Sequence, residues 1–589
     1  MSAPALADTL DTNTVNRPQD GSLDWDAIYW PKVEEDVRRL RRRIFKASQA
    51  EDLKQVRNLQ KLMLNSFSNT LHSVRRVTQL NAGRFTAGID GQVALTSQDR
   101  TRLAEDIHSR PSHWDARAVR RVYIPKAGGK KRPLGIPVLT DRVLQARVVN
   151  ALEPEWEARF EPRSYGFRPG RSCQDAVQAI FMTLRGKNAK RQWILDADLS
   201  AAFDRIDHHR LLEHLGTFPA RGMITKWLAA GTVEAGLFTP TRAGTPQGGV
   251  ISPLLLNIAL HGMEEAAGVR YTRCDPEGSH TVVSSPVLVR YADDFIVMCH
   301  TRDQAEQARH RLAEWLLPRG LRFNEEKTQI LHVDHGFDFL GFTIRRYNDK
   351  LLITPSKAAI KRIRDRITAE VVSLRGSNAD AVIRRLNPII RGWAIYYRSV
   401  AATGTFTALD HFMWQVLYRW ALRAHPNKPR KWVVDRYFGT FNPSRRDRWV
   451  FGDRASGRYI RHFSWTRIIR HSMVQGTASI DDPALIDYWA ARRRKAHLTI
   501  GGRTASLLHR QQGLCAVCGQ MLLDTEHAPQ SPHQWEQWTH SVRKALNRTA
   551  LITDTVPGDG PVTRLMHPFC RNTPRQKDPA ENRRSKGLA

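Results

Sequence analysis

Apolar residues recur at helical spacing in a basic segment near the start of the chain. After Pro31, the residues Val33, Val37, Leu40 and Ile44 follow one another at intervals of three or four, which predicts a helix with one buried stripe. The positions between them carry mainly cations: Arg38, Arg39, Arg41, Arg42, Arg43 and Lys46. Taken alone, this basic face is explained by solvation. The charge of the whole chain favours contact with nucleic acid.

The pattern changes over residues 115–345. Short apolar runs, such as QWILDAD and SPVLVRY, are separated by turns rich in Gly and Pro, with helical segments between them. This alternation predicts a block of mixed α and β structure. Beyond it, Ser356 can cap a helix whose apolar face is formed by Ile360, Ile363, Ile367 and Val371, so a basic helical domain begins there. No internal repeat of fixed period is present.

Aromatic residues interleave with arginine in the helical domain, through RGWAIYYRSV and LDHFMWQVLYRWALRAH. Aromatic side chains at such positions most often belong to the core. Next to arginine, they also suit stacking on unpaired nucleic-acid bases. Both interpretations stay open from the sequence.

Composition adds a strong positive charge to this picture. The 589 residues are enough for several domains, and 91 Lys and Arg against 58 Asp and Glu give a net charge of +33. Since 41% of the residues are apolar, we expect a folded cationic protein whose partner is a polyanion. No apolar stretch is long enough for a membrane span, and no basic residue precedes Arg17 as in a presequence. We therefore expect no membrane partner, no secretion and a cytoplasmic location, at the nucleoid in a bacterium.

Two apolar segments end in carboxylates. The sequence VLVRYADDFIVM predicts a β-hairpin with Asp293 and Asp294 at its tip. Alone, a solvated acidic turn is the commoner explanation. In WILDADLSAAFD, however, a strand ends at Asp198 and runs into a helix. Carboxylates on adjacent strands suit Mg²⁺, and nucleotidyl transfer uses two such ions, one on the attacking 3′-hydroxyl and one on the triphosphate.

A glycine-rich segment, AGTPQGGVISPLLLNIAL, lies between these strands. Its glycines allow a base pair to approach the backbone closely before a helix begins near Ser252; they are Gly244, Gly248 and Gly249. Upstream, Lys126 and Arg132 flank a turn and would suit triphosphate oxygens. Solvated turn charges explain this pair equally well.

Ordered motifs now carry a specific resemblance. They are TAGIDG, IPKAGGKKRPLGIP, SYGFRPGRSCQDA, LDADLSAAFD, PQGGVISPLLLNI, YADD, GLRFNEEKT, FDFLGF and LNPIIRGWAIYYR. Over roughly residues 25–475 the chain resembles the reverse transcriptase of group II intron-encoded proteins. The resemblance implies an α+β multidomain protein, with the fingers and palm of a right-hand polymerase. An α-helical thumb, or maturase domain, that binds intron RNA follows, then segments for DNA binding and endonuclease activity.

The resemblance also implies roles for single residues. Asp198, Asp293 and Asp294 become the catalytic ligands of two Mg²⁺ ions. Phe203 becomes the steric gate that excludes a 2′-hydroxyl, and Gln247 lines the nucleotide pocket. The remaining roles are triphosphate binding by Lys126 and Arg132, a place near the pyrophosphate for Lys327, and the primer grip for Phe339, Leu340 and Gly341.

A cysteine module lies near the end of the chain. CAVC and HPFC supply Cys515, Cys518, His567 and Cys570, which together make a Cys₃His zinc set. Unrelated buried thiols are the alternative explanation. The module resembles the zinc-bearing HNH endonuclease domain that ends many group II intron proteins.

The same module departs from that family at its catalytic positions. Trp538 and Thr539 stand where imidazoles are expected, Arg571 replaces a His, and Val562 replaces an Asn. His540 could replace only one base. We therefore expect one structural zinc ion in a nucleic-acid-contacting module that has lost nuclease chemistry.

These observations predict the following organisation: a tail over 1–24, a basic helical extension of the fingers over 25–115, fingers and palm over 116–345, the thumb or maturase domain over 346–475, a basic DNA-binding segment over 476–504, the zinc module over 505–575 and a tail over 576–589. The expected function is RNA-directed DNA synthesis combined with maturase activity, with intron RNA, target DNA and dNTPs as partners. A stand-alone or defence-associated reverse transcriptase and a non-enzymatic splicing factor are the alternatives. Loss of the three acids would mark the splicing factor, but all three are present. A site-specific nuclease is disfavoured by the degenerate module.

Overall fold

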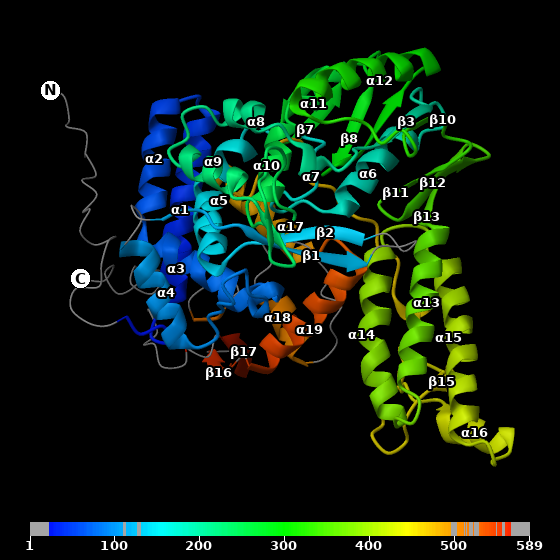
Figure 1. Cartoon of the computed structure of the whole chain (residues 1–589). Helices are drawn as coiled ribbons and strands as arrows, with labels where there is room; N and C mark the ends of the chain where they lie inside the picture. The colour runs from blue at the N-terminus through cyan, green and yellow to red at the C-terminus, as the bar shows by residue number, and fades with distance from the viewer. Residues whose placement is uncertain are drawn as a thin grey trace, which may run out of the picture. The chain divides into compact units, whose positions relative to one another are not determined.

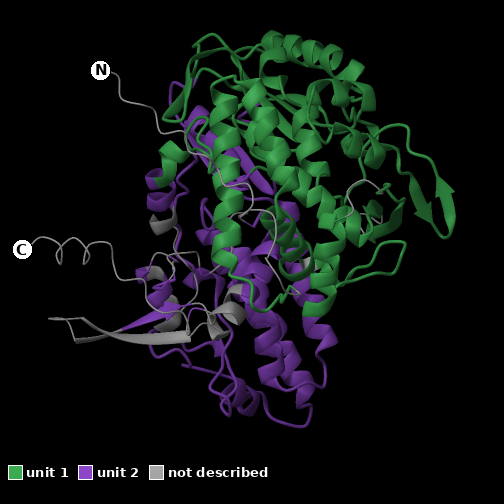
Figure 2. Cartoon of the chain, turned by 90° about the vertical axis from the view of Figure 1, so that its left-hand side faces the viewer, with its two compact units in different colours: residues 1–168, 190–331, 475–486 green, residues 169–189, 332–474, 487–589 purple. Residues whose placement is uncertain are grey.

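The chain folds into two compact units, each assembled from separate segments (Figure 2). The computed structural model describes residues 23–109, 114–125, 131–495, 503–511, 513, 515–517, 522, 529–548, 550–556, 560–566 and 570. Unit 1 comprises residues 1–168, 190–331 and 475–486, and unit 2 comprises residues 169–189, 332–474 and 487–589. The predicted terminal tails fall almost wholly outside the described residues.

Helices at the start of unit 1 pack around one long buried helix. They are α1 (Trp30–Gln49), α2 (Leu53–Asn65), α3 (Phe67–Arg75), α4 (Ser97–Ser109) and the buried α5 (Leu139–Glu157). The predicted apolar stripe of α1 is confirmed, because Val33, Val37, Leu40 and Ile44 are all buried.

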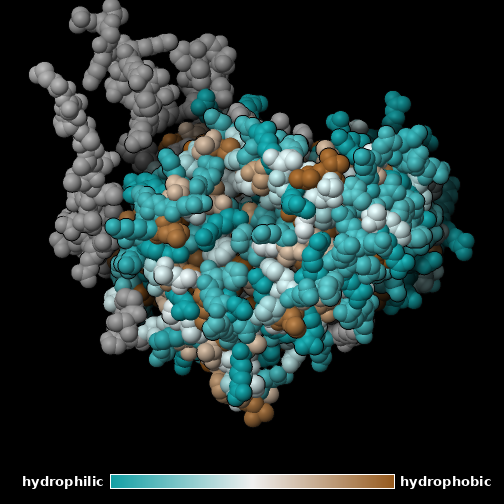
Figure 3. Space-filling model, turned by 90° about the horizontal axis from the view of Figure 1, so that it is seen from above, coloured by the Kyte–Doolittle hydropathy of each residue, from teal (hydrophilic) through white to brown (hydrophobic). Residues whose placement is uncertain are grey.

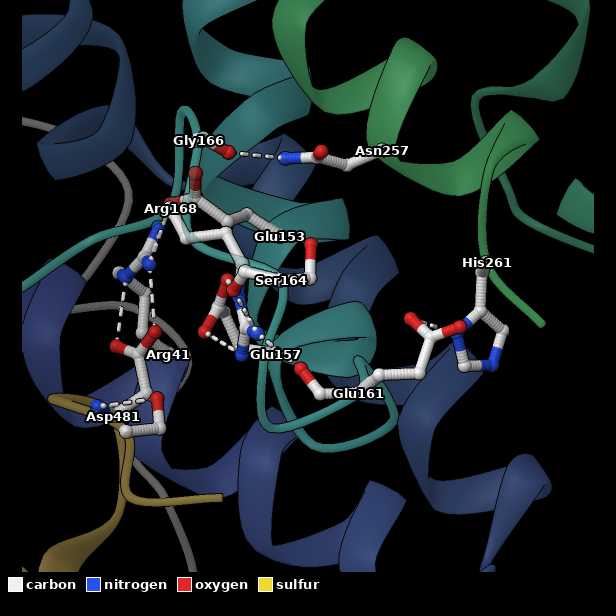
Figure 4. A network of polar contacts seen from close by, with 11 residues as sticks. Arg41, Glu153, Glu157, Glu161, Ser164, Gly166, Arg168, Asn257, His261 and Asp481 are labelled. Atoms are coloured by element: carbon white, nitrogen blue, oxygen red, sulfur yellow. Dashed lines mark hydrogen bonds and ion pairs between the residues drawn. The ribbon is translucent and has the colours of Figure 1, made fainter. Parts of the chain in front are cut away.

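One member of the predicted basic face of α1 is largely buried and paired with acids. Arg41 is only 11% exposed and pairs with Glu153 at 2.8 Å and Asp481 at 2.7 Å (Figure 4). Assigning Arg41 to the nucleic-acid face was therefore wrong. Its partners lie far away in the sequence, where helical spacing cannot reveal them.

A four-stranded sheet carries the predicted carboxylates. Its order is β10-β3-β9-β8, and β9 pairs antiparallel with both β3 and β8. The strands are β3 (Trp193–Asp198), β8 (Val287–Tyr291), β9 (Asp294–Cys299) and β10 (Gln329–His332). Helix α12 (Arg302–Leu316) packs against β3 and β9 (Figure 1). The predicted hairpin and the predicted strand end at Asp198 are both confirmed.

A second four-stranded sheet in unit 1 has the order β2-β1-β4-β5. Its strands are β1 (Val119–Pro125), β2 (Lys131–Ile136), β4 (Thr232–Glu234) and β5 (Leu237–Thr239). The remaining elements of the unit are α7 (Ala202–Arg205), α8 (His208–Leu215), α9 (Arg221–Ala229), α10 (Ser252–Ala259), α11 (Met263–Ala266), β6 (Tyr271–Asp275) and β7 (Gly278–Thr281). The predicted helix start near Ser252 is thus confirmed. The predicted mixture of helix and sheet holds across the unit.

Unit 2 contains a three-stranded sheet followed by helices that run side by side (Figure 1). Its elements are α6 (Cys173–Leu184), β11 (Phe337–Phe339), β12 (Phe342–Tyr347), β13 (Lys350–Pro355), α13 (Lys357–Ser373), α14 (Ala379–Tyr397), α15 (Thr403–Ala424), α16 (Arg430–Tyr437), β14 (Phe438–Gly439) and β15 (Val450–Phe451). Ser356 caps α13 by accepting a hydrogen bond from the amide of Ala359, as predicted. Trp393, Tyr396 and Tyr397 are buried, so these aromatic residues of α14 belong to the core.

The C-terminal segment of unit 2 packs on the same helices. Its elements are α17 (Ile486–Lys495), α18 (Arg503–Arg510), α19 (Pro532–Arg548), β16 (Ala550–Val556) and β17 (Gly560–Met566). Helix α19 lies along α14. The contact is closest at Gly392, where an added Cβ would lie 2.7 Å from the Pro532 carbonyl oxygen and 2.8 Å from the Glu536 nitrogen. Arg366 pairs with Glu536 at 2.7 Å beside this contact.

A buried carboxylate joins three more segments of unit 2. Asp175 forms a capping box with Ser172 at the start of α6. It also accepts hydrogen bonds from His471 Nε2 at 2.8 Å and Arg492 at 3.0 Å. Although burial opposes ionisation, the charge and hydrogen bond of His471 and the charge of Arg492 lower the pKa of Asp175. The ionised carboxylate therefore stabilises this junction.

The surface agrees with the polar composition. The face in Figure 3 is largely hydrophilic, with only scattered hydrophobic residues. Among the described helices, none combines the length and the apolar character needed to cross a membrane.

Candidate active site

The three predicted carboxylates come together at the end of the unit 1 sheet. Asp198 is the last residue of β3 and faces Asp294, the first residue of β9, in the antiparallel register. Asp293 occupies the turn before β9, next to Ala292, whose φ of 58° is left-handed. The tight turn therefore places adjacent acids opposite the strand end that carries the third.

Residues beneath the hairpin hold this turn in place. Arg290 Nη1 donates to Asn257 Oδ1 at 3.0 Å and to the Ala292 carbonyl at 3.3 Å. Asn257 Nδ2 in turn donates to the Gly166 carbonyl at 2.9 Å (Figure 4). A Cβ on Gly166 would lie 2.3 Å from the Ala292 nitrogen, so only glycine permits this approach.

The segment before Gly166 is locked by buried charges. Arg168 donates to both oxygens of Glu157 at 2.9 Å, and also to the Ser164 carbonyl (Figure 4). Glu161 contacts His261 Nδ1 at 3.2 Å. Although burial opposes it, this contact with His261 lowers the pKa of Glu161 to about 2. These bonds make the loop that touches the hairpin a rigid support.

Sequence reasoning missed these supporting residues. Gly166 and Asn257 lie inside the SYGFRPG and PLLLNI motifs, and Arg290 precedes YADD. The motifs marked their importance, but the bonds between them join elements that are distant in sequence. A single cation within the apolar run VLVRY, directly before the two acids, was the signal available in the sequence.

Burial and neighbouring charges act on two of the carboxylates, Asp293 and Asp294. Burial raises the pKa of Asp293, and the charge of Asp198 adds to the shift. Burial and the charges of Asp293 and Asp198 raise the pKa of Asp294 to about 8. Like charges held together in this way favour a cationic partner.

Lys327 already supplies one positive charge. Its Nζ donates to Asp198 Oδ2, and the amide of Asn324 donates to the Asp198 carbonyl at 2.8 Å. Among the described residues, no group of three or more His, Cys, Asp or Glu side chains is arranged to hold a metal ion. The described geometry therefore shows a carboxylate cluster countered by lysine.

The structure describes most of the residues that the sequence predicts to contact a nucleotide. Arg132, exposed at the start of β2, has a charge that lowers the pKa of Asp293, which places it within electrostatic reach. Phe203 is half-buried in α7 and meets Phe167 edge to face, with the ring centroids 6.2 Å apart. The Gln247 carbonyl accepts from the Gly135 amide at 2.6 Å, which joins the glycine-rich segment to β2. Lys126 lies outside the described residues.

Backbone conformation and close packing also explain why glycine occupies two positions of that segment. Gly244 has a φ of 84°, and a Cβ there would lie 2.6 Å from the Phe203 carbonyl oxygen. Gly248 has a φ of 113°, and its Cβ would lie 2.9 Å from the Gly135 carbonyl oxygen. Both glycines are therefore needed for close contacts within the protein. The sequence alone explains them only by the approach of a base pair.

The predicted primer-grip residues belong to unit 2. Phe339 is buried, while Leu340 and Gly341 form a tight turn with φ values of 51° and 83°. Tyr396 Oη donates to the Leu340 carbonyl at 3.0 Å, and a Cβ on Gly341 would lie 2.9 Å from Tyr397 Oη. Helix α14 thus fixes the shape of this turn.

The zinc set is only partly described. Cys515 and Cys570 are buried, whereas Cys518 and His567 lie outside the described residues. Arg571, which replaces the expected His, also lies outside them. On α19, Thr539 is buried and its hydroxyl donates to the Trp535 carbonyl at 2.7 Å, and His540 is exposed. The backbone of Val562 pairs with Asp554 in the β16–β17 hairpin.

Comparison with known families gives three matches in chain order. Residues 25–107 match the N-terminal domain of reverse transcriptase. Residues 124–344 match the family described as reverse transcriptase (RNA-dependent DNA polymerase). Residues 360–438 match the group II intron maturase-specific domain.

Individual relatives match parts of the chain. Protein YkfC of Escherichia coli (strain K12) is 38% identical over 310 residues, which cover 47% of this chain and 80% of that protein. The group II intron-encoded protein LtrA of Lactococcus lactis subsp. cremoris is 32% identical over 38% of this chain and 47% of its own length. Maturase-like protein 1 of Euglena gracilis is 24% identical over 63% of this chain and 76% of its own length. The match thus spans about half of the Lactococcus protein.

Proposed function

Because the chain belongs to the family of group II intron reverse transcriptases and maturases, it is an RNA-directed DNA polymerase and maturase, and we propose that it copies its own intron RNA from a primer in the target DNA. One observation carries the polymerase assignment: Asp198 and Asp294 are register partners, with Asp293 beside them. A non-enzymatic splicing factor would have no use for three acids held together at an electrostatic cost.

The carboxylate cluster fits Mg²⁺. Its donors are hard oxygens, and burial and mutual repulsion raise the pKa of both Asp293 and Asp294, so a cation would be stabilised there. When bound, two Mg²⁺ ions would lower the pKa of the primer 3′-hydroxyl and hold the triphosphate. Asp198, Asp293 and Asp294 would be their ligands.

Side chains around the cluster would bind and select the nucleotide. Arg132 and Lys126 would hold the triphosphate oxygens by charge-assisted hydrogen bonds. Lys327, which now donates to Asp198, would turn towards the departing pyrophosphate. Phe203 would exclude a 2′-hydroxyl, Gln247 would line the base pair, and the turn at Phe339, Leu340 and Gly341 would support the primer end.

Maturase activity would depend on RNA binding by the basic helices. Helix α13 carries the cations Lys361, Arg362 and Arg364 outside its apolar face, whereas Arg366 on the same helix is paired with Glu536. If the protein contacts about six to ten phosphates, its affinity for RNA should fall roughly 10³- to 10⁵-fold when the salt concentration rises from about 50 to 200 mM. The folded RNA supplies the splicing nucleophile, so the protein would act by stabilising that fold.

For the C-terminal module we propose one structural zinc ion and no nuclease activity. Cys515, Cys518, His567 and Cys570 would fill a tetrahedral shell with no open position, which is typical of structural zinc. Burial of Cys515 and Cys570 supports this set. Trp538 and the buried Thr539 cannot act as the missing imidazoles.

Two assays test these proposals. The polymerase assay extends a primer annealed to poly(A) RNA with Mg²⁺, and no extension by the intact protein would refute the polymerase assignment. The second assay measures the zinc content of the purified chain and of Cys518→Ser. We expect one zinc per chain, and we expect Cys518→Ser to lose it while primer extension continues. Cleavage of target DNA by the intact protein that is lost in His540→Ala would instead support the nuclease hypothesis.

A further inference from the structure

An aromatic cavity lies in the thumb helices, apart from the carboxylate site. It has a volume of about 470 Å³ and lies between α15 and the chain around residues 449–464. We call it the aromatic pocket and define it by His411, Trp414, Trp449, Arg461 and His462, which line it. Its size falls within the range of small-ligand sites.

The walls of the aromatic pocket are arranged for stacking. Trp414 lies nearly parallel to His411 and to Tyr418, with interplanar angles of 18° and 5°. Trp449 stands perpendicular to Trp414, with the ring centroids 6.2 Å apart, and it is 58% exposed. An exposed tryptophan at the mouth of a cavity offers a flat apolar face to a ligand.

Unused hydrogen-bond donors accompany these rings. Trp414 Nε1 and Arg461 Nε are buried and have no partner among the described residues. An unpaired buried donor is costly, so an acceptor that reached either of these two donors would be stabilised there. Burial also lowers the pKa of Arg461, although its guanidinium stays charged.

A basic cavity of about 340 Å³ adjoins the aromatic pocket and shares Trp449 and His462 with it. Arg445 and Arg448 line this second cavity and are exposed. The Arg445 guanidinium lies over the Trp465 ring at 5.4 Å. The one acidic residue in its lining, Asp447, is engaged by the Trp465 indole N–H at 2.5 Å. Arg445 and Arg448 therefore line a cavity that shares the exposed ring of Trp449 with the aromatic pocket.

We propose that the aromatic pocket captures a single unpaired base of bound RNA, while Arg445 and Arg448 hold the adjoining phosphates. A nucleobase offers a flat face to Trp449 and ring or carbonyl acceptors to the unused donors. An apolar peptide would leave Arg445 and Arg448 unmatched, whereas a nucleotide uses both cavities. This inference deepens the proposed function and rests on it, since it requires a chain that binds RNA.

The test uses the full chain and a fluorescent base. An eight-nucleotide single-stranded RNA with one 2-aminopurine reports stacking by quenching, and the same strand in a duplex has no free base. We expect quenching with the single strand only. Base–aromatic stacking accounts for about 1–3 kcal/mol, so Trp449→Ala should weaken the quenching interaction roughly 5- to 150-fold.

Three further variants separate the contributions. Trp414→Phe keeps the ring and removes the donor, so we expect a loss of about 2- to 12-fold. Arg445→Gln and Arg448→Gln should each reduce the salt slope of binding by about one. Tyr347→Ala is the matched control, because Tyr347 is 48% exposed and lies beneath Arg345 on the β12–β13 hairpin.

The outcomes distinguish this inference from the proposed function. Quenching that persists unchanged in Trp449→Ala would overturn the aromatic pocket as a base site and leave it to a protein segment. An equal loss in Tyr347→Ala would also overturn it, since any exposed aromatic would then suffice. Failure of the intact chain to bind any RNA in a filter assay would overturn the proposed function itself.

Discussion

Asp198 and Asp294 face each other across the antiparallel strands β3 and β9. Each carboxylate lies at one end of a strand whose interior residues are mostly buried, so the rigid sheet determines their separation. Arg290 and Asn257 hold the turn between β8 and β9 from behind. In the proposed polymerase these carboxylates would therefore need little rearrangement before substrate binds, which is the condition for efficient positioning.

Replacing Asp293 by Ala should abolish primer extension. The change removes a proposed metal ligand at the turn and also relieves the repulsion that raises the pKa of Asp294. RNA affinity should change little, since an acid contributes nothing favourable to phosphate binding. Extension on poly(A) and filter binding of RNA measure the two effects, with Glu314→Gln on the exposed surface of α12 as control.

Splicing should survive the same substitution, because the RNA performs that chemistry. Full DNA synthesis by Asp293→Ala would remove this residue from the metal site. Loss of synthesis, RNA binding and splicing together would indicate a misfolded hairpin.

Shortening Phe203 to Val should admit ribonucleotides. The half-buried ring packs edge to face on Phe167, whose φ of 63° is itself unusual, so its position is well supported. Removing the ring would open the space that a 2′-hydroxyl requires. Competition between dNTP and rNTP on one template measures the preference, and an unchanged preference would contradict the steric-gate assignment.

Local patterns in the sequence predicted much of this site. The strand end at Asp198, the hairpin at Asp293 and the helix of Val33 to Ile44 each depend on neighbours within a few residues. Glycine spacing also marked the segment around Gly248. These features appear in the structure where the sequence places them.

Long-range pairings could not be predicted in this way. Arg41 was expected on a nucleic-acid face, but its partners Glu153 and Asp481 come from distant parts of the chain. Lys327 reaches Asp198 across the sheet, and Trp449 reaches Trp414 on α15. Periodicity within one element carries no information about which distant element covers it.

Acid should weaken unit 2 through Asp175. Its pKa is lowered in the folded chain, so its stabilisation is fully present above the ordinary value of 3.8 and is lost progressively as the pH falls below that value towards the lowered pKa of the folded chain. Asp175→Asn should cost about 3–5 kcal/mol near neutral pH, because His471 and Arg492 lose a buried partner. Hydrogen exchange of the α6 amides measures this local loss.

The difference between Asp175→Asn and the unchanged chain should narrow as the pH falls below about 4, because the unfolded chain then takes up a proton that the folded Asp175, with its lowered pKa, does not. Asp303→Asn, at the exposed start of α12, is the matched carboxylate control and should show no difference. Equal exchange in α6 for Asp175→Asn and the unchanged chain at pH 7 would refute the stabilising role.

Adding a methyl group at Gly392 should loosen the C-terminal module. The Cβ of Gly392→Ala would meet backbone atoms of Pro532 and Glu536 at 2.7 and 2.8 Å, and backbone cannot rotate aside as a side chain can. Overpacking of this kind costs about 1–3 kcal/mol, so α19 should separate from α14 more often. Limited proteolysis within residues 529–548 measures the effect.

Gly404→Ala is the control for this change, because a Cβ at Gly404 in α15 meets no atom within 4 Å. It should be neutral or slightly stabilising, since alanine favours a helix.

A further variant, Glu536→Gln, removes the ion pair with Arg366. Its effect should add less than fully to that of Gly392→Ala, because both act on one contact. Primer extension on poly(A) should persist in all three variants, since none of them changes the carboxylate cluster of unit 1 or the Tyr396–Leu340 hydrogen bond. If Gly392→Ala and Gly404→Ala are cleaved at the same rate, α19 does not rest on α14 in solution, and the module is held to the chain by other contacts.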